Sequence, residues 1–283
     1  MVERRPLLQW LSHLVLIAGI LIVALPVYIT FVASTHTTDE IIHPPMSLLP
    51  GSHLIENYTA ALLGERTGPG SHAPVGRMML ISLGMALAIA LGKIAISLLS
   101  AFAIVYFRFP FRMLFFWAVF CTLMLPVEVR IGPTYKVVSD LGMLNSFAGL
   151  TIPLIASATA TFLFRQFFLT VPEELTEASR MDGAGPMRFF FDVLLPLSVT
   201  SIAALFVIQF IYGWNQYLWP LLVTTDESMY PVVIGIKRMI SGGDAQTEWS
   251  AIMATAMLAM IPPALVVMAM QRWFVKGLVD AEK

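Results

Sequence analysis

Long apolar stretches, separated by short polar segments, run along almost the whole chain. A helix needs about 20 mostly apolar residues to cross the hydrocarbon core of a bilayer, which is about 30 Å thick. Six stretches reach this length, so the pattern predicts an all-α membrane protein with six transmembrane helices in a single domain, residues 1–283. The predicted spans lie at about 11–33, 78–106, 113–134, 147–168, 197–223 and 250–271.

The composition agrees with this pattern, since 58% of the residues are hydrophobic and only 12% are charged. A soluble domain of ordinary composition has about 25% charged residues. The first apolar stretch is longer than the apolar part of a signal peptide, about 7–15 residues, so we expect it to be retained as a membrane anchor. The single cysteine, Cys121, excludes a disulfide framework. A net charge of -1 gives no reason to expect a nucleic acid partner.

The distribution of Lys and Arg predicts which side each loop faces, because cytoplasmic loops carry an excess of these residues. Six spans place both termini on one side of the membrane. With the termini in the cytoplasm, the inner segments hold ten Lys and Arg residues, and the longer outer loops hold five. We therefore expect N- and C-termini in the cytoplasm, a cytoplasmic segment at 170–196 and a large outer loop at about 34–76.

The cytoplasmic segment 170–196, between the fourth and fifth spans, carries the signals of a helical hairpin. Thr170 can cap a first helix, and Pro172 suits its first turn. Glu173 and Glu174 suit the positive end of the helix dipole. We therefore expect a short helix to begin here.

The other end of this first helix is marked by Gly183, which can take the left-handed conformation that stops a helix. Arg180 follows Glu177 by three residues, a spacing at which the two side chains can pair. Gly185-Pro186 starts a second helix, because a residue without an N–H fits the first turn. Pro196 marks the junction of the second helix with the fifth span.

The surface of the first helix is flat at Ala178 and Ser179, whose side chains are small. Another protein can therefore approach it closely. The residues alone equally allow an amphipathic hairpin that rests on the membrane surface.

The spacing within this segment resembles a motif of importer permeases of the ATP-binding-cassette (ABC) class. That motif is Glu-Ala-Ala, three residues, Gly, nine residues, an aliphatic residue, one more residue and Leu-Pro. Glu177-Ala178-Ser179, Gly183, Val193 and Leu195-Pro196 match it, with Ser179 in place of the second alanine. In this family the segment is the coupling helix that fits a groove on a cytoplasmic ATPase. The resemblance implies coupling roles for Glu177, Ala178, Ser179, Asp182, Gly183, Leu195 and Pro196.

Other segments extend the resemblance over nearly the whole chain. Segment 210–220 resembles the Trp-Asn…Trp-Pro signature of sugar-type importer permeases. Residues 271–273 with 277–278 resemble the tail of a maltose importer permease. Segments 122–130 and 156–161 resemble permeases of bacterial sn-glycerol-3-phosphate importers.

This resemblance implies import of glycerol-3-phosphate, with glycerophosphodiesters or another sugar or polyol as alternatives. It also implies a multi-pass protein of the bacterial inner membrane. The expected partners are a second homologous permease subunit, an ATPase dimer on the cytoplasmic side, a periplasmic substrate-binding protein and membrane lipid. ATP and Mg would bind to the partner ATPase, and this chain would need no cofactor or metal.

Lys93, Glu128 and Arg130 fall within predicted spans, where a charged side chain normally faces a partner or a water-filled path. Lys93 lies near the middle of the second span. Glu128 and Arg130 lie toward the outer end of the third span, after Pro126, which can break a helix. In one interpretation, Lys93 and Glu128 form an ion pair between two spans. In the other, Lys93 or Arg130 holds an anionic substrate, since Arg suits a phosphate group.

Aromatic and amide residues alternate in segment 212–219. Aromatic faces and amide groups suit a polyol or sugar, so Trp214, Asn215 and Gln216 are further candidates for the substrate path. The aromatic residues also fit a belt at the outer membrane interface. A belt accounts less well for the two amides.

Small residues recur at every fourth position in two spans. This spacing lets helix backbones approach closely. We therefore expect the small residues to contact neighbouring spans or the second permease, and not the substrate. They are Gly84, Ala88 and Gly92 in the second span, and Ser157 and Thr161 in the fourth.

Two other classes of protein fit less well. A secondary transporter usually shows internal repeats and more than six spans, and Glu128 is the one embedded carboxylate available for a proton relay. An enzyme would need a catalytic motif, such as HExxH or a nucleophile elbow, that this sequence does not contain. Gly92-Lys93 matches the end of a phosphate-binding loop, but Leu87 stands where its first glycine belongs. ATP-driven transport would therefore need an ATPase on another chain.

Overall fold

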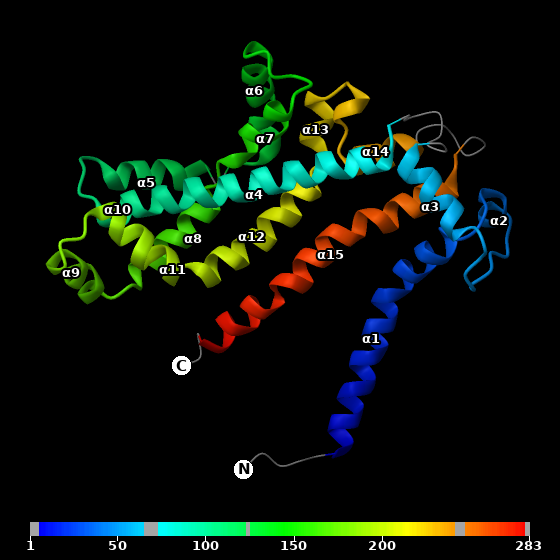
Figure 1. Ribbon diagram of the computed structural model, residues 1–283, viewed down its shortest axis with the longest axis horizontal. Helices are drawn as coiled ribbons and strands as arrows, with labels where there is room; N and C mark the ends of the chain where they lie inside the picture. Colours follow the sequence, from blue (N-terminus) through cyan, green and yellow to red (C-terminus); the bar gives the residue numbers. More distant parts are fainter. Residues whose placement is uncertain (1–5, 65–72, 123–124, 241–246, 281–283) are drawn as a thin grey trace. The chain divides into compact units, whose positions relative to one another are not determined.

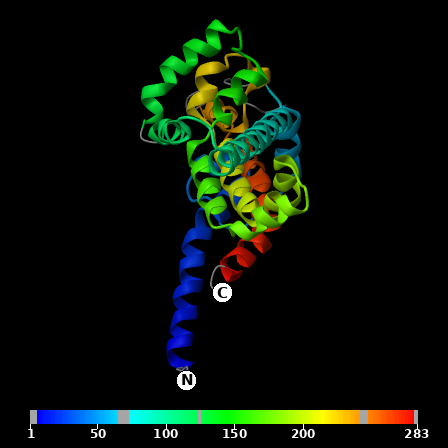
Figure 2. The same ribbon diagram turned by 90° about the vertical axis from the view of Figure 1, so that its left-hand side faces the viewer.

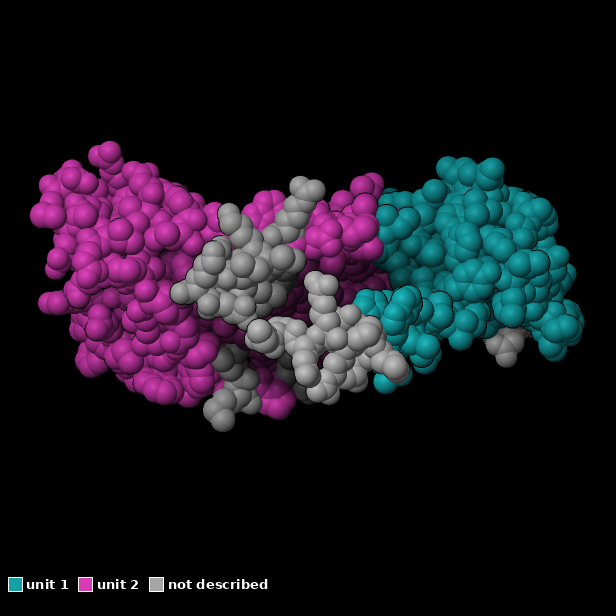
Figure 3. All heavy atoms as spheres, turned by 90° about the horizontal axis from the view of Figure 1, so that it is seen from below, with its two compact units in different colours: residues 1–77, 235–261 teal, residues 78–234, 262–283 magenta. Residues whose placement is uncertain are grey.

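The computed structural model describes residues 6–64, 73–122, 125–240 and 247–280. Every regular element within these ranges is a helix and none is a strand, as the all-α prediction requires. The chain forms two compact units (Figure 3). Unit 1 consists of Met1–Arg77 and Gly235–Ile261, and unit 2 consists of Met78–Ile234 and Pro262–Lys283.

Unit 1 begins with a long apolar helix whose sides are exposed almost throughout. In the most apolar part of this helix only 6% of the residues are buried, as expected of a helix in contact with lipid. The unit also holds two short helices and the first part of the last helix. These elements are α1 (Pro6–Ala33), α2 (Thr38–Ile42), α3 (Leu54–Leu63) and the start of α15 (Trp249–Asp280).

The predicted outer loop is held together by hydrogen bonds to its backbone. Asn57 on α3 is buried, and its side-chain amide donates to the carbonyl oxygens of Ser34 and His36 at 3.0 and 2.8 Å. Thr37 caps α2 and forms a reciprocal capping box with Glu40. The loop is therefore partly ordered into helices.

Unit 2 contains the remaining helices, most of them shorter than a membrane is thick. They are α4 (Val75–Tyr106), α5 (Arg112–Cys121), α6 (Val127–Asp140), α7 (Phe147–Ile155), α8 (Ala158–Leu169), α9 (Glu173–Met181), α10 (Pro186–Phe189), the π-helix η2 (Phe190–Leu194), α11 (Leu195–Leu197), α12 (Val199–Trp214), α13 (Leu218–Val223) and the 3₁₀-helix η3 (Glu227–Met229). Helix α14 (Val232–Ile240) begins in unit 2 and continues into unit 1.

Helix α4 is the central element of unit 2, and α12 runs alongside it (Figures 1 and 2). A Cβ atom on Gly213 of α12 would lie only 2.9 Å from the Cα atom of Ala86. One on Gly92 would lie 2.8 Å from the side chain of Ile155 in α7, and Gly84 also faces α7. The expectation that the small residues of the second span contact neighbouring helices is therefore confirmed for Gly84 and Gly92.

Two apolar clusters stabilise unit 2. One joins α4, α8 and the hairpin through Ile94, Leu98, Ala101, Phe102, Ala160, Phe164, Phe168, Phe189, Phe190, Leu194 and Leu205. The other joins α4, α6, α7 and α13 through Met85, Ile89, Val138, Leu150, Trp219 and Val223.

Fewer continuous spans occur in the described residues than the six that the sequence predicts. Three helical segments are long and apolar enough to cross a membrane: Trp10–Ala33, Val75–Tyr106 and Trp249–Gln271. Two bent pairs raise the number to five if each is one span. One pair is α7 with α8, bent by 42°, and the other is Pro186–Leu197 with α12, bent by 72°.

The predicted third span, 113–134, is not one continuous helix, and the break lies at Pro126, where the sequence allowed it. Helix α5 ends at Cys121 and α6 begins at Val127, with Pro126 in an extended conformation before it. Proline lacks the N–H that would continue the helix. The fourth and fifth predicted spans are also broken, at Ala156-Ser157 and at 215–217.

Candidate functional site

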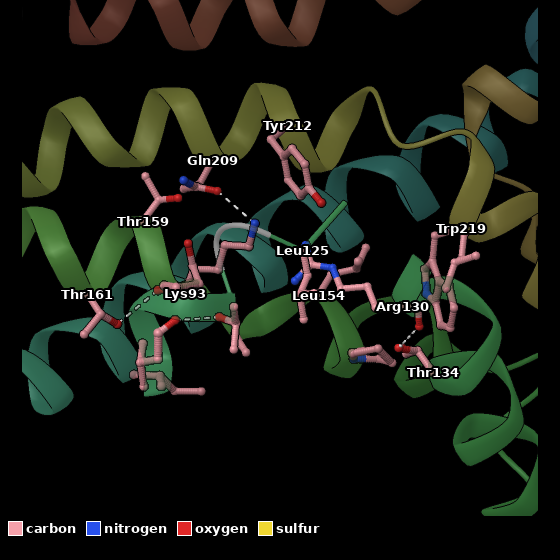
Figure 4. A pocket seen from close by; sticks show the side chains of 18 of the residues that line it. Lys93, Leu125, Arg130, Thr134, Leu154, Thr159, Thr161, Gln209, Tyr212 and Trp219 are labelled. Carbon is pink, nitrogen blue, oxygen red and sulfur yellow. Dashed lines mark hydrogen bonds between the residues drawn. The ribbon is translucent and has the colours of Figure 1, made fainter. Parts of the chain in front are cut away.

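Three of these helix breaks meet at one cavity in unit 2, with a volume of about 820 Å³ (Figure 4). Residues at the ends of α5 and α6, between α7 and α8, and just before α13 line it, and α4 and α12 complete its walls. The polar side chains of the lining come from Lys93, Ser100, Thr122, Arg130, Thr134, Ser157, Thr159, Thr161, Gln209, Tyr212 and Gln216.

The break between α7 and α8 shows how the wall is stabilised. Ser157 is extended and caps α8, because its hydroxyl oxygen accepts from the backbone N–H of Ala160. Its carbonyl accepts from the hydroxyls of Thr161 and Ser97 at 3.0 and 3.3 Å. An irregular backbone is tolerated at membrane depth only where its polar groups are satisfied or face a cavity. Ser157 and Thr161 thus form part of the cavity wall, whereas the sequence suggested packing contacts only.

Lys93 is buried, with 6% of its surface exposed, and both of its described partners lie on α12. Its ammonium nitrogen donates to Oε1 of Gln209 at 3.0 Å. The same nitrogen lies 3.7 Å from the ring centroid of Tyr212, a cation–π contact. The predicted ion pair with Glu128 stays a prediction, because the side chain of Glu128 lies outside the described part of the structure.

The cavity carries a positive charge. Lys93 and Arg130 point into the same space (Figure 4), and the charge of Arg130 acts on the ammonium group of Lys93. Neither Asp nor Glu occurs among the described residues that line the cavity. Two cations without a lining carboxylate favour an anionic guest.

The alternating aromatic and amide segment is divided between the cavity and the core. Gln216 lines the cavity, and its side chain donates to the carbonyl of Tyr212 at 3.1 Å. Trp214 is buried and stacks on Phe210, so it is a packing residue. Asn215 caps the end of α12 and is exposed away from the cavity lining. The interpretation of Trp214 and Asn215 as path residues is therefore not supported by the geometry.

Gln209 lines the cavity and was missed by sequence reasoning, whereas Trp219, which belongs to the aromatic and amide segment 212–219, lines it as that segment suggested. Gln209 is a lone amide within an apolar helix, a signal that can be read from the sequence once charged residues are set aside. Trp219 is positioned by its indole N–H, which donates to the carbonyl of Gly149 at 3.0 Å. Only the structure shows that Trp219 lines the cavity, because a tryptophan is also common at a membrane interface.

The cavity offers positive charge, hydroxyl groups and amides for binding a solute. Its described lining includes no carboxylate pair and no nucleophile held by a histidine. Among the described residues of the whole chain, no group of three or more His, Cys, Asp or Glu side chains is arranged to hold a metal ion.

The predicted hairpin is present at the end of unit 2 where α4 ends and α5 begins (Figure 1). Helix α9 ends in a Schellman motif, in which Gly183 has a φ of 72° and the N–H of Ala184 donates to the carbonyl of Ser179. Gly185 precedes Pro186 at the first turn of α10, as predicted.

Two details of the hairpin prediction are wrong. Thr170 does not cap α9, because it ends α8 and its hydroxyl donates to the carbonyl of Phe167. The N-cap of α9 is Pro172, two residues after the predicted cap. Glu177 and Arg180, both described, form no ion pair. An exposed pair of this kind contributes little, so solvation of the two charges competes well with pairing.

The two arms of the hairpin differ in how they are held. No residue of α9 is buried. The second arm is anchored, because Phe190 packs against Phe102 with ring centroids 5.0 Å apart and Phe189 packs against Tyr106 at 5.2 Å. Helix α9 therefore stands on the surface, and the arm that follows it is packed against α4.

Comparison with known proteins adds to this geometry. Residues 80–280 match the family model described as "Binding-protein-dependent transport system inner membrane component". The sn-glycerol-3-phosphate transport system permease proteins UgpE of Agrobacterium fabrum and Brucella melitensis are each 63% identical to this chain over 287 residues, which cover 100% of both proteins.

The fold is similar to one chain in the crystal structure of a bacterial ABC transporter involved in the import of the acidic polysaccharide alginate. The TM-score is 0.78 at 19% identity, and the match covers 97% of this chain and 99% of that chain. These similarities remove the secondary transporter and the membrane enzyme from consideration. The chain belongs to the family of inner-membrane components of binding-protein-dependent transport systems.

Proposed function

We propose that this chain is a permease subunit of an ABC importer that moves glycerol-3-phosphate across the inner membrane. The names of its full-length relatives suggest the substrate. The observation that carries the proposal is the cavity with Lys93 and Arg130 and with no carboxylate in its described lining. A charged side chain within a membrane span is costly unless it serves a path or a partner.

The chemistry of the cavity suits both parts of this substrate. The guanidinium group of Arg130 can form two parallel hydrogen bonds with phosphate oxygens, and Lys93 adds a second positive charge. The hydroxyl groups of Thr134 and Thr159 and the amide of Gln216 suit the glycerol part, because each can donate or accept. Glu128 would partly neutralise the positive charge of the path, or it would form an ion pair with Lys93 when no substrate is bound.

Energy would come from ATP and Mg bound to a separate ATPase dimer that docks on the hairpin. No residue of α9 is buried and the second arm is anchored, and both observations support this docking. Glu177, Ala178, Ser179, Asp182 and Gly183 would form the contact, and Leu195 and Pro196 would connect it to α12.

The proposal includes six membrane crossings with both termini in the cytoplasm. The broken pair of α5 and α6 would form the third crossing, because α5 is apolar and its ten residues rise about 15 Å, half of the hydrocarbon thickness. Residues 170–196 would form the cytoplasmic coupling loop. A second permease would complete the cavity wall, and a periplasmic binding protein would deliver the substrate.

A second candidate substrate is a glycerophosphodiester. A cavity of about 820 Å³ lies at the upper end of the range for small-molecule sites, about 300–1,000 Å³, and leaves room for a second substituent on the phosphate. A diester keeps one negative charge, so both cations remain useful.

The experiment is a solute screen on the purified complex of this chain with its permease, ATPase and binding-protein partners. We expect glycerol-3-phosphate to stimulate ATP hydrolysis, and neutral glycerol to have no effect at the same concentration. Stimulation by glycerol or a neutral sugar, with none by glycerol-3-phosphate, would refute the assignment.

A further inference from the structure

Lys93 is held by groups that carry no charge. Lys93 and Gln209 are 6% and 7% exposed, and the ammonium donates to the amide oxygen of Gln209 at 3.0 Å. The ring of Tyr212 covers the same ammonium at 3.7 Å. A buried lysine is ordinarily paired with a carboxylate. Here the described partners are an amide and an aromatic ring.

The neutral partners of Lys93 determine how much positive charge the cavity offers to a bound solute. A carboxylate at the position of Gln209 would cancel the charge of Lys93. An amide oxygen and a ring face stabilise the ammonium and leave its full positive charge in the cavity, together with that of Arg130 (Figure 4). Two nearby like charges repel one another, so an anion between them relieves the repulsion.

The fold also fixes where this charge points. Gln209 and Tyr212 are three residues apart on α12 and therefore lie on one face of the helix. Gly213 lets α12 approach α4 closely, since a Cβ atom there would lie 2.9 Å from the backbone of Ala86. A lysine side chain is flexible, and this pair of contacts restricts its ammonium to one place.

We propose that Gln209 and Tyr212 are the specificity-determining positioning residues of the path. These contacts hold the ammonium of Lys93 in place without neutralising its charge, and the cavity thereby selects solutes that carry a phosphate over neutral polyols. This inference rests on the proposed function and adds to it the residues that set anion selectivity.

The test is Gln209→Glu in the purified complex with its binding protein, ATPase and second permease. The substitution keeps the size of the side chain and changes the contact with Lys93 into an ion pair. We expect the KM for glycerol-3-phosphate in stimulated ATP hydrolysis to rise about tenfold or more, because the net charge facing the phosphate falls by one. The yield and melting temperature of the complex should not fall. A merely structural link between α4 and α12 predicts an unchanged KM, and that result would overturn the proposal.

Two further variants separate charge from packing. The exchange Lys93→Gln with Gln209→Lys returns the ammonium to the cavity from α12, so it should recover most of the affinity that Lys93→Gln alone loses. Tyr212→Phe keeps the ring face and should keep the wild-type KM, whereas Tyr212→Leu should raise it. Equal KM values for the Phe and Leu variants would contradict the role of the ring.

The matched control is Gln166→Glu, which adds the same charge on α8 at an exposed position outside the cavity lining. Its KM should equal that of the wild type. If glycerol-3-phosphate fails to stimulate the wild-type complex, the proposed function is wrong. If it stimulates the wild type and the KM of Gln209→Glu is unchanged, the role of Gln209 is wrong.

Discussion

Arg130 reaches the cavity from the first turn of α6, and its main-chain carbonyl accepts a hydrogen bond from the hydroxyl of Thr134 at 2.8 Å. Its guanidinium is free of any described ion pair, so it is available to an anion. The side chain is therefore placed to bind a phosphate through a bidentate pair of hydrogen bonds.

Substitution of Arg130 should separate charge from geometry. Arg130→Gln should raise the KM for glycerol-3-phosphate about tenfold or more, and Arg130→Lys should recover only part of the loss, because an ammonium keeps the charge without the planar fork. Substrate-stimulated ATP hydrolysis by the complex measures both. A wild-type KM in Arg130→Gln would exclude Arg130 from the path.

The sequence identifies Lys93 and Arg130 because a charge in an apolar helix stands out against its neighbours. Gln209 was passed over because it carries no charge, although a lone amide in an apolar helix is also a signal. Trp214 and Asn215 were assigned to the path on residue type. Each helical residue is turned by about 100° from the one before it, so Trp214 lies about 200° around α12 from the cavity residue Tyr212 and is buried.

At the scale of the element, the short helices of unit 2 end where the cavity begins. Pro126 predicts the break between α5 and α6, because proline lacks the N–H that would continue a helix. The break at 215–217 falls on the amides Asn215 and Gln216, which were interpreted as path residues and not as a helix end. The break at Ala156-Ser157 has no charged residue to mark it. The capping role of Ser157 is the local signal, but serine also occurs within membrane helices. The cavity walls were thus harder to predict than the hairpin, whose Gly and Pro residues mark the ends of its helices directly.

The turn between α9 and α10 offers a test of coupling. Gly183 has a φ of 72°, and no atom lies within 4 Å of where its Cβ would be, so a larger residue strains the backbone without a clash. Gly183→Val should cost about 1–2 kcal/mol in this turn and displace α9. We expect ATP-driven uptake to fall several-fold while the complex still assembles.

Gly185→Val is the matched control for that variant, because Gly185 has an ordinary φ of -71° and equally free surroundings. It should transport at nearly the wild-type rate. Normal uptake by Gly183→Val, measured beside this control, would show that the hairpin has no part in coupling.

Helix α2 in the outer loop gives a prediction about pH. The backbone N–H of Thr37 and the side chain of His36 lower the pKa of Glu40 from its ordinary value of 4.5. A lowered pKa in the folded state means that the carboxylate stabilises α2 above about pH 4.5 and that this contribution is lost as the pH falls through the lower value. Glu40→Gln should therefore speed amide hydrogen exchange in Thr38–Ile42 at pH 7. Equal exchange rates in the two proteins at pH 7 would refute this.

At the scale of the whole molecule, the proposed topology rests on the Lys and Arg distribution and on the proposed number of crossings. Three continuous helices, two bent pairs and the broken pair of α5 and α6 together allow six crossings. Six crossings would place both termini on one side of the membrane, which the proposal assigns to the cytoplasm together with the hairpin.

Single cysteines test this topology in a Cys121→Ser background. Ser52→Cys in the outer loop should react with a membrane-impermeant thiol reagent in intact cells, because Ser52 is exposed. Ser179→Cys on α9 should react only after the inner membrane is opened. Labelling of Ser179→Cys in intact cells would place the hairpin outside and exclude an ATPase contact.

The central claim is that a positively charged cavity in this chain carries a phosphate ester across the membrane. The most direct measurement is ATP-driven uptake of glycerol-3-phosphate, at a concentration below KM, by proteoliposomes that contain the complete complex with either wild-type chain or Lys93→Gln. The account predicts ATP-dependent uptake by the wild type and a rate about tenfold lower for Lys93→Gln, as expected from loss of one nearby charge. Equal rates for the two proteins would contradict it.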